Sequence, residues 1–188
     1  MLMYESLKKN LEPLTILLSE LNHPPHFIAI TETKINEDTG LNFARNIPGY
    51  SFAHSDTQYA AGGVAIYTKD IILYVVRHDL SEILTEAERL WLEVILNGKK
   101  TVISIIYRHP APHYDSFTKE LENILHNLND KKVTYCICGD FNINLLQHES
   151  SQQVKNYTNL MLAYNCTQLI TRPTKITDHS ATLLDHIH

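Results

Sequence analysis

The sequence has no long apolar run. No stretch reaches the roughly 18 consecutive apolar residues of a transmembrane helix, and the opening MLMYESLKKNLEP has no apolar segment followed by a small-residue cleavage site. We therefore expect no membrane span and no signal peptide, which favours an intracellular protein.

Cysteine and positive charge are also scarce. Two of the 3 cysteines, Cys136 and Cys138, lie in an apolar run that is predicted to form a buried strand, so neither a disulfide framework nor a zinc site is expected. The formal net charge of −5 argues against a module that binds nucleic acid through overall charge. It does not exclude an enzyme that holds phosphate through a metal ion and a few local contacts.

What is present fits one globular domain. Hydrophobic residues make up 44% of the chain and charged residues 20%, which is ordinary for a soluble protein. A chain of 188 residues is long enough for one core and short for two domains. We expect a single domain over residues 1–188, without internal repeats.

The first half of the chain changes from a helical to a β pattern. Leucines at helical spacing predict a helix that ends near Asn22, with Asn10 as its N-cap and Pro13 in its first turn. A short buried strand should follow at 27–30. Five segments between residues 50 and 108 are typical of strands, and Asn97-Gly98 predicts a tight hairpin between the last two.

The second half returns to alternation of helix and strand. Apolar residues between 117 and 128 and between 154 and 164 predict two helices, with the strand VTYCIC between them and loop and strand after them. Helices alternating with strands indicate the α/β class.

Polar side chains stand at the ends of several predicted strands. They are Glu32, Tyr107, Arg108, Asp140, Asn142 and Asp185. Because α/β sheets gather their sites at the carboxyl ends of strands, we expect these side chains to lie close together. Carboxylates at close range repel one another unless a cation lies among them, and oxygen ligands without a Cys or His cluster favour Mg²⁺ or Mn²⁺.

Each of these residues also has an ordinary structural interpretation. Glu32 and Asp185 could cap turns, Asp140 could belong to an Asx-turn, and Tyr107 could be a packing residue at a strand end. The glycines of AGGVAIY lack the spacing of a phosphate-binding loop and are predicted to serve a turn or close strand packing. Spacing alone leaves both interpretations open.

Five segments in this order add a resemblance: IAITETK, GGVAIY, IIYRHP, CGDFNIN and SATLLDHI. Together they resemble the endonuclease/exonuclease/phosphatase superfamily, and specifically the apurinic-like endonuclease domain of LINE-type, jockey-like non-LTR retrotransposons. The resemblance implies a four-layer α/β sandwich in which two mixed β-sheets pack face to face and helices flank them. Since the family's motifs continue on both sides of these segments, it also implies a fragment that is incomplete at its N- and C-termini, with apolar sheet edges exposed.

The resemblance further implies phosphodiester hydrolysis that depends on Mg²⁺ or Mn²⁺. Glu32 would bind the metal, Asp140 would orient or deprotonate the attacking water, and Asn142 would hold the scissile phosphate. Tyr107 and the adjacent Arg108 would contact the substrate, and Asp185 would orient a catalytic histidine or the site around it. His186 belongs to the LLDHI motif and does not correspond to the histidine of the family's later Ser-Asp-His motif.

In the retroelement setting the substrate would be chromosomal DNA in the nucleus, and the nicked end would prime a reverse transcriptase domain of the full-length element. Three alternatives stay open. The chain could be a non-catalytic retroelement remnant, a phosphatase or phosphodiesterase acting on a phospholipid or inositol phosphate, or an α/β binding protein without a metal.

Overall fold

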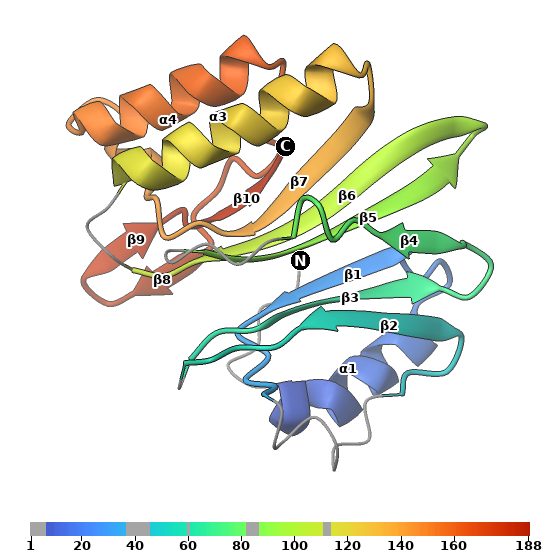
Figure 1. Cartoon of the computed structure of the whole chain (residues 1–188). Helices are drawn as coiled ribbons and strands as arrows, with labels where there is room; N and C mark the ends of the chain where they lie inside the picture. The colour runs from blue at the N-terminus through green and yellow to red at the C-terminus, as the bar shows by residue number, and fades with distance from the viewer. Residues whose placement is uncertain (1–6, 37–45, 60, 82–86, 111–113) are drawn as a thin grey trace.

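Two β-sheets pack face to face, and helices cover their outer faces (Figure 1). The computed structural model describes residues 7–36, 46–59, 61–81, 87–110 and 114–188. In chain order the elements are α1 (Leu7–Glu20), β1 (Phe27–Thr31), β2 (Tyr50–Ser55), β3 (Val64–Lys69), β4 (Tyr74–Val76), β5 (Ala87–Leu96), β6 (Lys99–Arg108), α3 (Tyr114–Asp130), β7 (Thr134–Asp140), the 3₁₀ turn η1 (Leu145–Gln147), α4 (Gln152–Ala163), β8 (Lys175–Thr177), β9 (Ser180–Thr182) and β10 (Asp185–Ile187). The expected α/β class is confirmed.

The smaller sheet has the order β1-β3-β2 and is antiparallel throughout. Helix α1 covers its outer face through apolar side chains that include Leu7, Leu14 and Leu18. The expected start of this helix at Asn10 is wrong, because α1 already includes Leu7 and Pro13 is its seventh residue. Leu7 is 1% exposed, so its burial favours the additional turn over a cap at Asn10.

The larger sheet has the order β10-β7-β6-β5-β4 and is mixed. Strands β6 and β7 run parallel and are connected through α3, while the other neighbours are antiparallel. The expected hairpin between β5 and β6 is confirmed: Asn97 and Gly98 adopt φ of 50° and 74°, as a tight turn of this kind requires.

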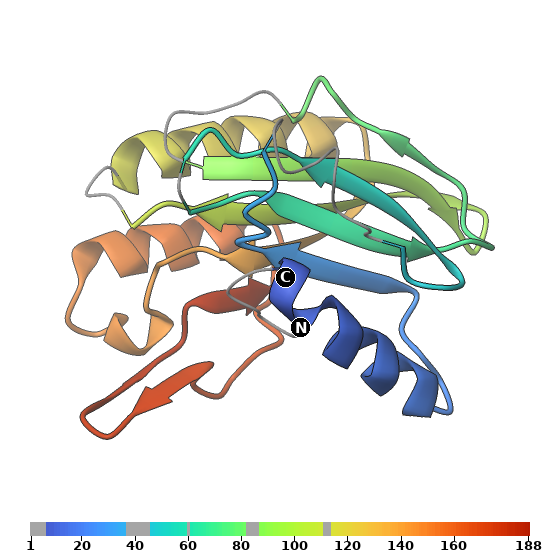
Figure 2. The same ribbon diagram turned by 90° about the horizontal axis from the view of Figure 1, so that it is seen from below.

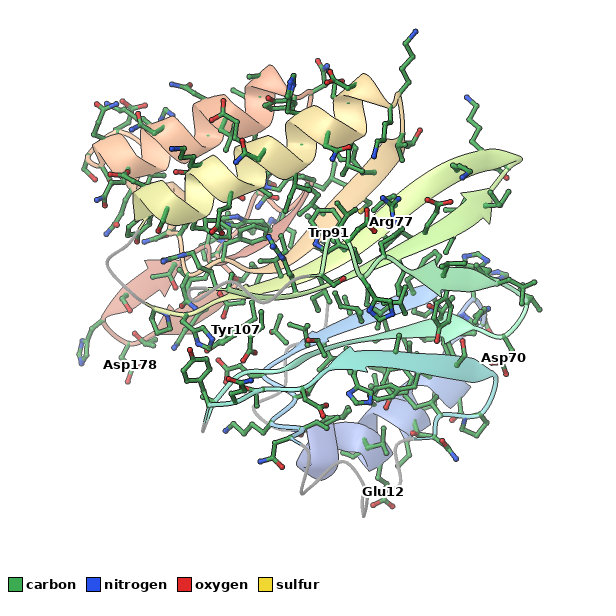
Figure 3. The ribbon with its side chains drawn as sticks, viewed as in Figure 1. Glu12, Asp70, Arg77, Trp91, Tyr107 and Asp178 are labelled. Atoms are coloured by element: carbon green, nitrogen blue, oxygen red, sulfur yellow. The ribbon has the colours of Figure 1, made fainter. Side chains whose placement is uncertain are left out.

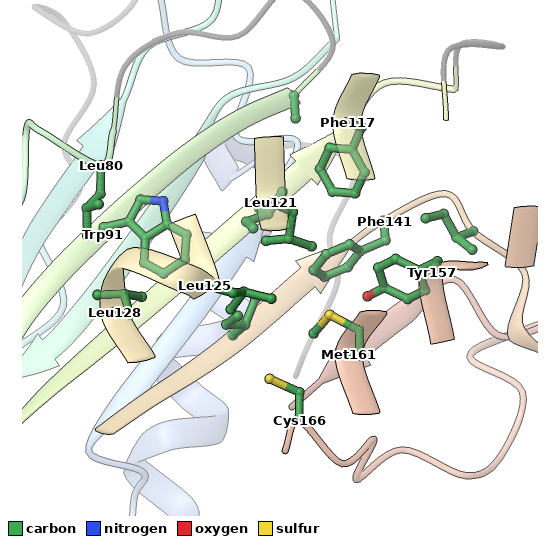
Figure 4. Packing of buried hydrophobic residues seen from close by; sticks show 14 of the residues in the cluster. Leu80, Trp91, Phe117, Leu121, Leu125, Leu128, Phe141, Tyr157, Met161 and Cys166 are labelled. Atoms are coloured by element: carbon green, nitrogen blue, oxygen red, sulfur yellow. The ribbon is translucent and has the colours of Figure 1, made fainter. Parts of the chain in front are cut away.

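Helices α3 and α4 cover the outer face of the larger sheet (Figure 1), and Figure 4 shows the buried side chains of this layer from close by. The centre of this layer is aromatic: the ring of Phe141 lies 6.0 Å from that of Phe117 and 5.7 Å from that of Tyr157, and Trp91 is fully buried. Both helices present the apolar faces that the sequence predicted. The resulting core gives β6 and β7 a rigid backing.

The space between the two sheets is mainly apolar. Strands β3, β5, β6 and β7 fill it with buried side chains that include Val64, Ile66, Leu90, Ile105 and Cys138. Figure 2, seen from below, shows the two sheets stacked, with the β8–β9 hairpin projecting from them. At the carboxyl ends of β6 and β7 polar side chains replace the apolar ones.

An apolar groove of about 300 Å³ lies where α1 and β1 approach β6, β7 and β10. Leu18, Phe27, Ile103, Cys136 and Ile187 contribute to its lining. Among the described strands, β1 is hydrogen-bonded on one side only, so the smaller sheet has an apolar free edge. None of the helices in the described ranges is long and apolar enough to cross a membrane.

Gly139 in β7 predicts a sharp sensitivity to side-chain size. It has φ of 148°, and a Cβ there would overlap the backbone carbonyl of Ile106 on β6. We expect Gly139→Ala to lower the free energy of unfolding by more than about 4 kcal/mol, because strands β6 and β7 would have to separate.

Gly98→Ala is the matched control. Gly98 also has positive φ, but nothing lies within 4 Å of its Cβ position, so only backbone strain of about 1 to 2 kcal/mol is expected. Urea unfolding of the two variants measures the difference. Equal losses would contradict the steric explanation.

Candidate active site

A row of polar side chains crosses four strands of the larger sheet. Glu88 of β5 pairs with Tyr107 of β6, Tyr107 with Asp140 of β7, and Asp140 with Asp185 of β10. Paired residues on neighbouring strands project to the same face of a sheet. Tyr107 packs between the two sheets (Figure 3), so the whole row faces the smaller sheet.

Glu32 reaches this row from the smaller sheet. It directly follows β1, and its φ of 52° is in the left-handed region, which is uncommon for a residue with a side chain. Its carboxylate lies close enough to the Tyr107 hydroxyl to act on it electrostatically. Burial, followed by the negative charge of Glu32, holds the pKa of Tyr107 well above its usual value, so the phenol keeps its proton.

Asp140 has the most perturbed carboxyl group of the row. It is 6% exposed, and burial is the main cause that raises its pKa to about 7, with further contributions from the negative charges of Asp185 and Glu32. The Asn142 backbone N–H, which donates to Oδ1 at 3.0 Å, and the charge of Lys175 act in the opposite direction. Two carboxyl groups, one from the neighbouring strand and one from the facing sheet, therefore act on that of Asp140.

Asp185 occupies a different part of its strand than expected. It begins β10 instead of ending a strand, and it reaches the row because β10 runs antiparallel to β7, so that the first residue of one meets the last of the other. Burial raises its pKa. Its Oδ1 is buried and has no hydrogen-bond partner among the described residues, which leaves an acceptor available in the site.

Asn142 is fixed beside Asp140 by a strained turn. It has φ of 48°, its N–H closes the hydrogen bond to Asp140, and its Nδ2 donates to the Arg108 carbonyl oxygen at 2.7 Å. The turn interpretation of Asp140 is thus correct for the local structure. It does not compete with a functional role, because the same turn presents both side chains at the strand end.

Arg108, expected as a substrate contact, lies outside the row. Arg108 follows Tyr107 on β6 and so projects to the opposite face, where it is 1% exposed and stacks on Tyr114 at 4.4 Å. Its Nε donates to the Phe141 carbonyl oxygen at 2.7 Å and its Nη2 to that of Asn142 at 2.9 Å. Arg108 therefore supports the turn after Asp140 from behind.

Glu88 is the member of the row that the sequence reasoning missed. A two-residue turn pairs residues at equal distances on its two sides, and Glu88 lies nine residues before Asn97 as Tyr107 lies nine after Gly98. That count places Glu88 opposite Tyr107 and could have identified it.

Two histidines near the end of the chain belong to the core and not to this row. The Tyr157 hydroxyl lies 2.9 Å from Nδ1 of His186 and 3.2 Å from Nε2 of His188. Burial lowers the pKa of His186 to about 3 and that of His188 to about 4. Both rings are therefore neutral at physiological pH and act as packing groups.

The oxygen donors of the row and of Glu32 suit a divalent metal ion that takes only part of its ligands from the protein. No three His, Cys, Asp or Glu side chains in the described ranges converge as a complete ligand set. Mg²⁺ characteristically takes one or two carboxylates and completes its shell with water and phosphate oxygens. Glu32 and the unpartnered Oδ1 of Asp185 are oxygen donors of this type.

The sequence model of the Endonuclease/Exonuclease/phosphatase family matches residues 8–187. The chain belongs to this family. Family membership indicates a phosphodiesterase or nuclease and suggests a metal-dependent hydrolase. No protein with a curated function matches the chain.

Several solved structures share the fold of this chain at low sequence identity. The endonuclease domain of TRAS1, a telomere-specific non-LTR retrotransposon, is 12% identical with a TM-score of 0.69 over 98% of this chain and 82% of that chain. An AP endonuclease from Archaeoglobus fulgidus is 15% identical, with a TM-score of 0.58 over 97% and 82%. TDP2 of D. rerio, solved with a single-stranded DNA product, is 15% identical, with a TM-score of 0.59 over 96% and 74%.

The raised pKa of Asp140 predicts how stability depends on pH. The ordinary value is 3.8 and the native one about 7, so between these pH values the native state binds more protons than the unfolded state. The free energy of unfolding should fall by on the order of 3 kcal/mol as the pH rises from about 4 to about 7. Asp140→Asn removes this loss and should be more stable than the wild type at pH 8 without divalent metal.

Urea unfolding with a chelator at pH 5 and pH 8 measures this effect, with the exposed Asp130→Asn as control. A stability difference between Asp140→Asn and the wild type that is the same at both pH values would contradict the assignment.

The buried hydrogen bonds of Arg108 predict a structural role. Lysine cannot reproduce both donor bonds and the stacking on Tyr114, so Arg108→Lys should lower the free energy of unfolding by about 2 kcal/mol. Arg77→Lys, at a partly exposed ion pair, should cost less than about 1 kcal/mol. Full stability of Arg108→Lys with weakened substrate binding would restore the expectation of a substrate contact.

Proposed function

We propose that this chain is the DNA-nicking endonuclease domain of a non-LTR retrotransposon, a single domain over residues 1–188 that hydrolyses phosphodiester bonds with Mg²⁺ or Mn²⁺. One observation carries the proposal: Tyr107, Asp140 and Asp185 form one buried row that Glu32 meets from the facing sheet. Such a concentration of perturbed acidic groups at the ends of strands is typical of a catalytic site.

Each residue of the row has a chemical role suited to its environment. Asp140, with a pKa of about 7, can accept a proton from water near neutral pH. The Tyr107 hydroxyl keeps its proton and can donate to a phosphate oxygen. Asn142 uses Nδ2 for one bond to the Arg108 carbonyl, so its second N–H can donate to the same phosphate.

Glu32 would hold the metal ion, with Asp185 close enough to affect the charge of the site. When bound, the ion would supply positive charge that stabilises the charge developing on the phosphate. A bound cation would also offset the repulsion between these two carboxylates, and so part of the cost of burying acidic groups here.

Local positive charge next to the row suits a polyanionic substrate despite the overall charge of −5. Lys175, on the exposed β8–β9 hairpin, lies close enough to lower the pKa of Asp140, and Arg172 is exposed just before it. Backbone phosphates could contact this hairpin while the scissile phosphate lies at Tyr107 and Asp140.

The retrotransposon assignment rests on the order of the five motifs and on the likeness to the TRAS1 endonuclease domain. In this setting the domain nicks chromosomal DNA in the nucleus. The 3′-hydroxyl at the nick then primes a reverse transcriptase domain of the same element.

Nicking of supercoiled plasmid in the presence of Mg²⁺ tests the proposal. We expect nicking by the wild type, loss of at least about 100-fold in Asp140→Ala, and unchanged nicking in Asp130→Ala, which removes an exposed acid at the end of α3. Nicking that survives Asp140→Ala would contradict the role of the row.

The alternative functions give different results. Binding of Mn²⁺ without turnover would indicate a non-catalytic retroelement remnant. Hydrolysis of an inositol phosphate or phospholipid without nicking would indicate a family member with a substrate other than nucleic acid.

A further inference from the structure

The carboxylate of Glu88 is engaged by donors from the smaller sheet. It is 7% exposed, and its Oε1 accepts a hydrogen bond from Thr57 Oγ1 at 2.5 Å, while its Oε2 accepts from the Gly63 N–H. His109 Nε2 lies 3.6 Å from Oε1. Glu88 thus connects β5 of the larger sheet to the turn that begins β3 of the smaller one.

The Gly62–Gly63 turn is in turn hydrogen-bonded to the segment that directly follows Glu32. The Thr33 N–H donates to the Gly63 carbonyl oxygen at 3.1 Å, and the Lys34 N–H donates to that of Gly62 at 2.8 Å. Both glycines are needed for so close an approach. A Cβ at Gly62 would lie 2.5 Å from the Glu88 carboxylate, and one at Gly63 would overlap Thr33 Oγ1.

Thr57 makes a second connection to the same segment. Its hydroxyl donates to Glu88, and its N–H donates to the Ile35 carbonyl oxygen at 2.9 Å. Two chains of hydrogen bonds therefore run from one carboxylate to residues 33–35.

The segment requires such support because its backbone is strained. Glu32 and Lys34 have φ of 52° and 56°, and neither is a glycine. Each left-handed residue of this kind costs on the order of 1 kcal/mol or more, and it persists only where the surroundings impose it.

We propose that Glu88 is a positioning residue that holds the backbone after Glu32, through Gly63 and Thr57, in the conformation that directs the Glu32 carboxylate to Tyr107 and the metal ion. The inference rests on the proposed function of Glu32. Glu88 differs from the proposed metal ligand Glu32 in that both of its carboxylate oxygens already accept hydrogen bonds, from Thr57 and Gly63.

Two readouts on Glu88→Ala test this inference. The first is hydrogen exchange of the Thr33 and Lys34 amides, which we expect to become at least about tenfold faster than in the wild type while amides of β6 and β7 keep their rates. The second is Mn²⁺ affinity measured by electron paramagnetic resonance, which we expect to fall by about tenfold or more, as is usual when a group that orients a metal ligand is removed.

Two further variants serve as controls. Glu88→Gln keeps the shape and one acceptor oxygen for the Gly63 N–H, so it should recover much of the Mn²⁺ affinity. If Glu88→Ala does not fold, Thr57→Val takes its place, because it removes one of the two hydrogen bonds to Glu88 and should change both readouts in the same direction by a smaller factor. Glu93→Ala removes a glutamate from the same strand but from the opposite face, where it pairs with Arg77 and Lys100, and it should leave both readouts unchanged.

The outcomes separate this inference from the proposed function. Unchanged exchange at Thr33 and Lys34, or faster exchange with wild-type Mn²⁺ affinity, overturns the positioning role of Glu88. A wild type that binds no Mn²⁺ overturns both the metal role of Glu32 and the inference built on it, and the exchange rates then report only whether Glu88 holds the backbone. Faster exchange together with weaker Mn²⁺ binding, absent in Glu93→Ala, supports the inference.

Discussion

Acidic side chains buried between two sheets lose their hydration and repel one another, and the rest of this structure is arranged around that cost. Glu88 is stabilised by donors from Thr57 and Gly63, and Asp140 by the Asn142 N–H and by the charge of Lys175. The cost that remains appears as the raised pKa of Asp140, which is due mainly to burial and then to the charges of Asp185 and Glu32, and as the unpartnered Oδ1 of Asp185. A site with this remaining cost is suited to a cation, which would offset it.

The two faces of the larger sheet have different roles: one supports the strand ends, and the other carries the polar row. On the face toward α3 and α4, Arg108 binds the carbonyl groups after Asp140, and Phe141 packs among aromatic rings, so the strand ends have little freedom. On the other face, Tyr107 and Asp140 meet Glu32 across the gap between the sheets. Precise placement of the polar groups thus depends on apolar packing one layer away.

The sequence predicted most elements because their signals are local. Asn97-Gly98 specified the hairpin, helical spacing specified α3 and α4, and strand ends brought Tyr107 and Asp140 together. Tertiary effects decided what local signals did not. Burial of Leu7 extended α1 past the cap at Asn10, and strand alternation turned Arg108 away from the row. Asp185 reached the row as expected, but through the antiparallel pairing of β10 and not as the end of a strand. Glu88 could be found only by counting residues from the hairpin turn to its position opposite Tyr107, and neither composition nor motifs give that information.

The row of side chains also determines where the chain can change in length. A residue inserted in β7 ahead of Asp140 would shift the residues beyond it by one position relative to β6. Because side chains alternate between the two faces of a strand, Asp140 would then face the helices, and a neighbouring apolar side chain would face the site. The same holds for β5, β6 and β10, since each contributes one member of the row. Related sequences that keep this chemistry should therefore vary in length at the turns and conserve the residue count between the Asn97-Gly98 turn and each of its flanking polar residues.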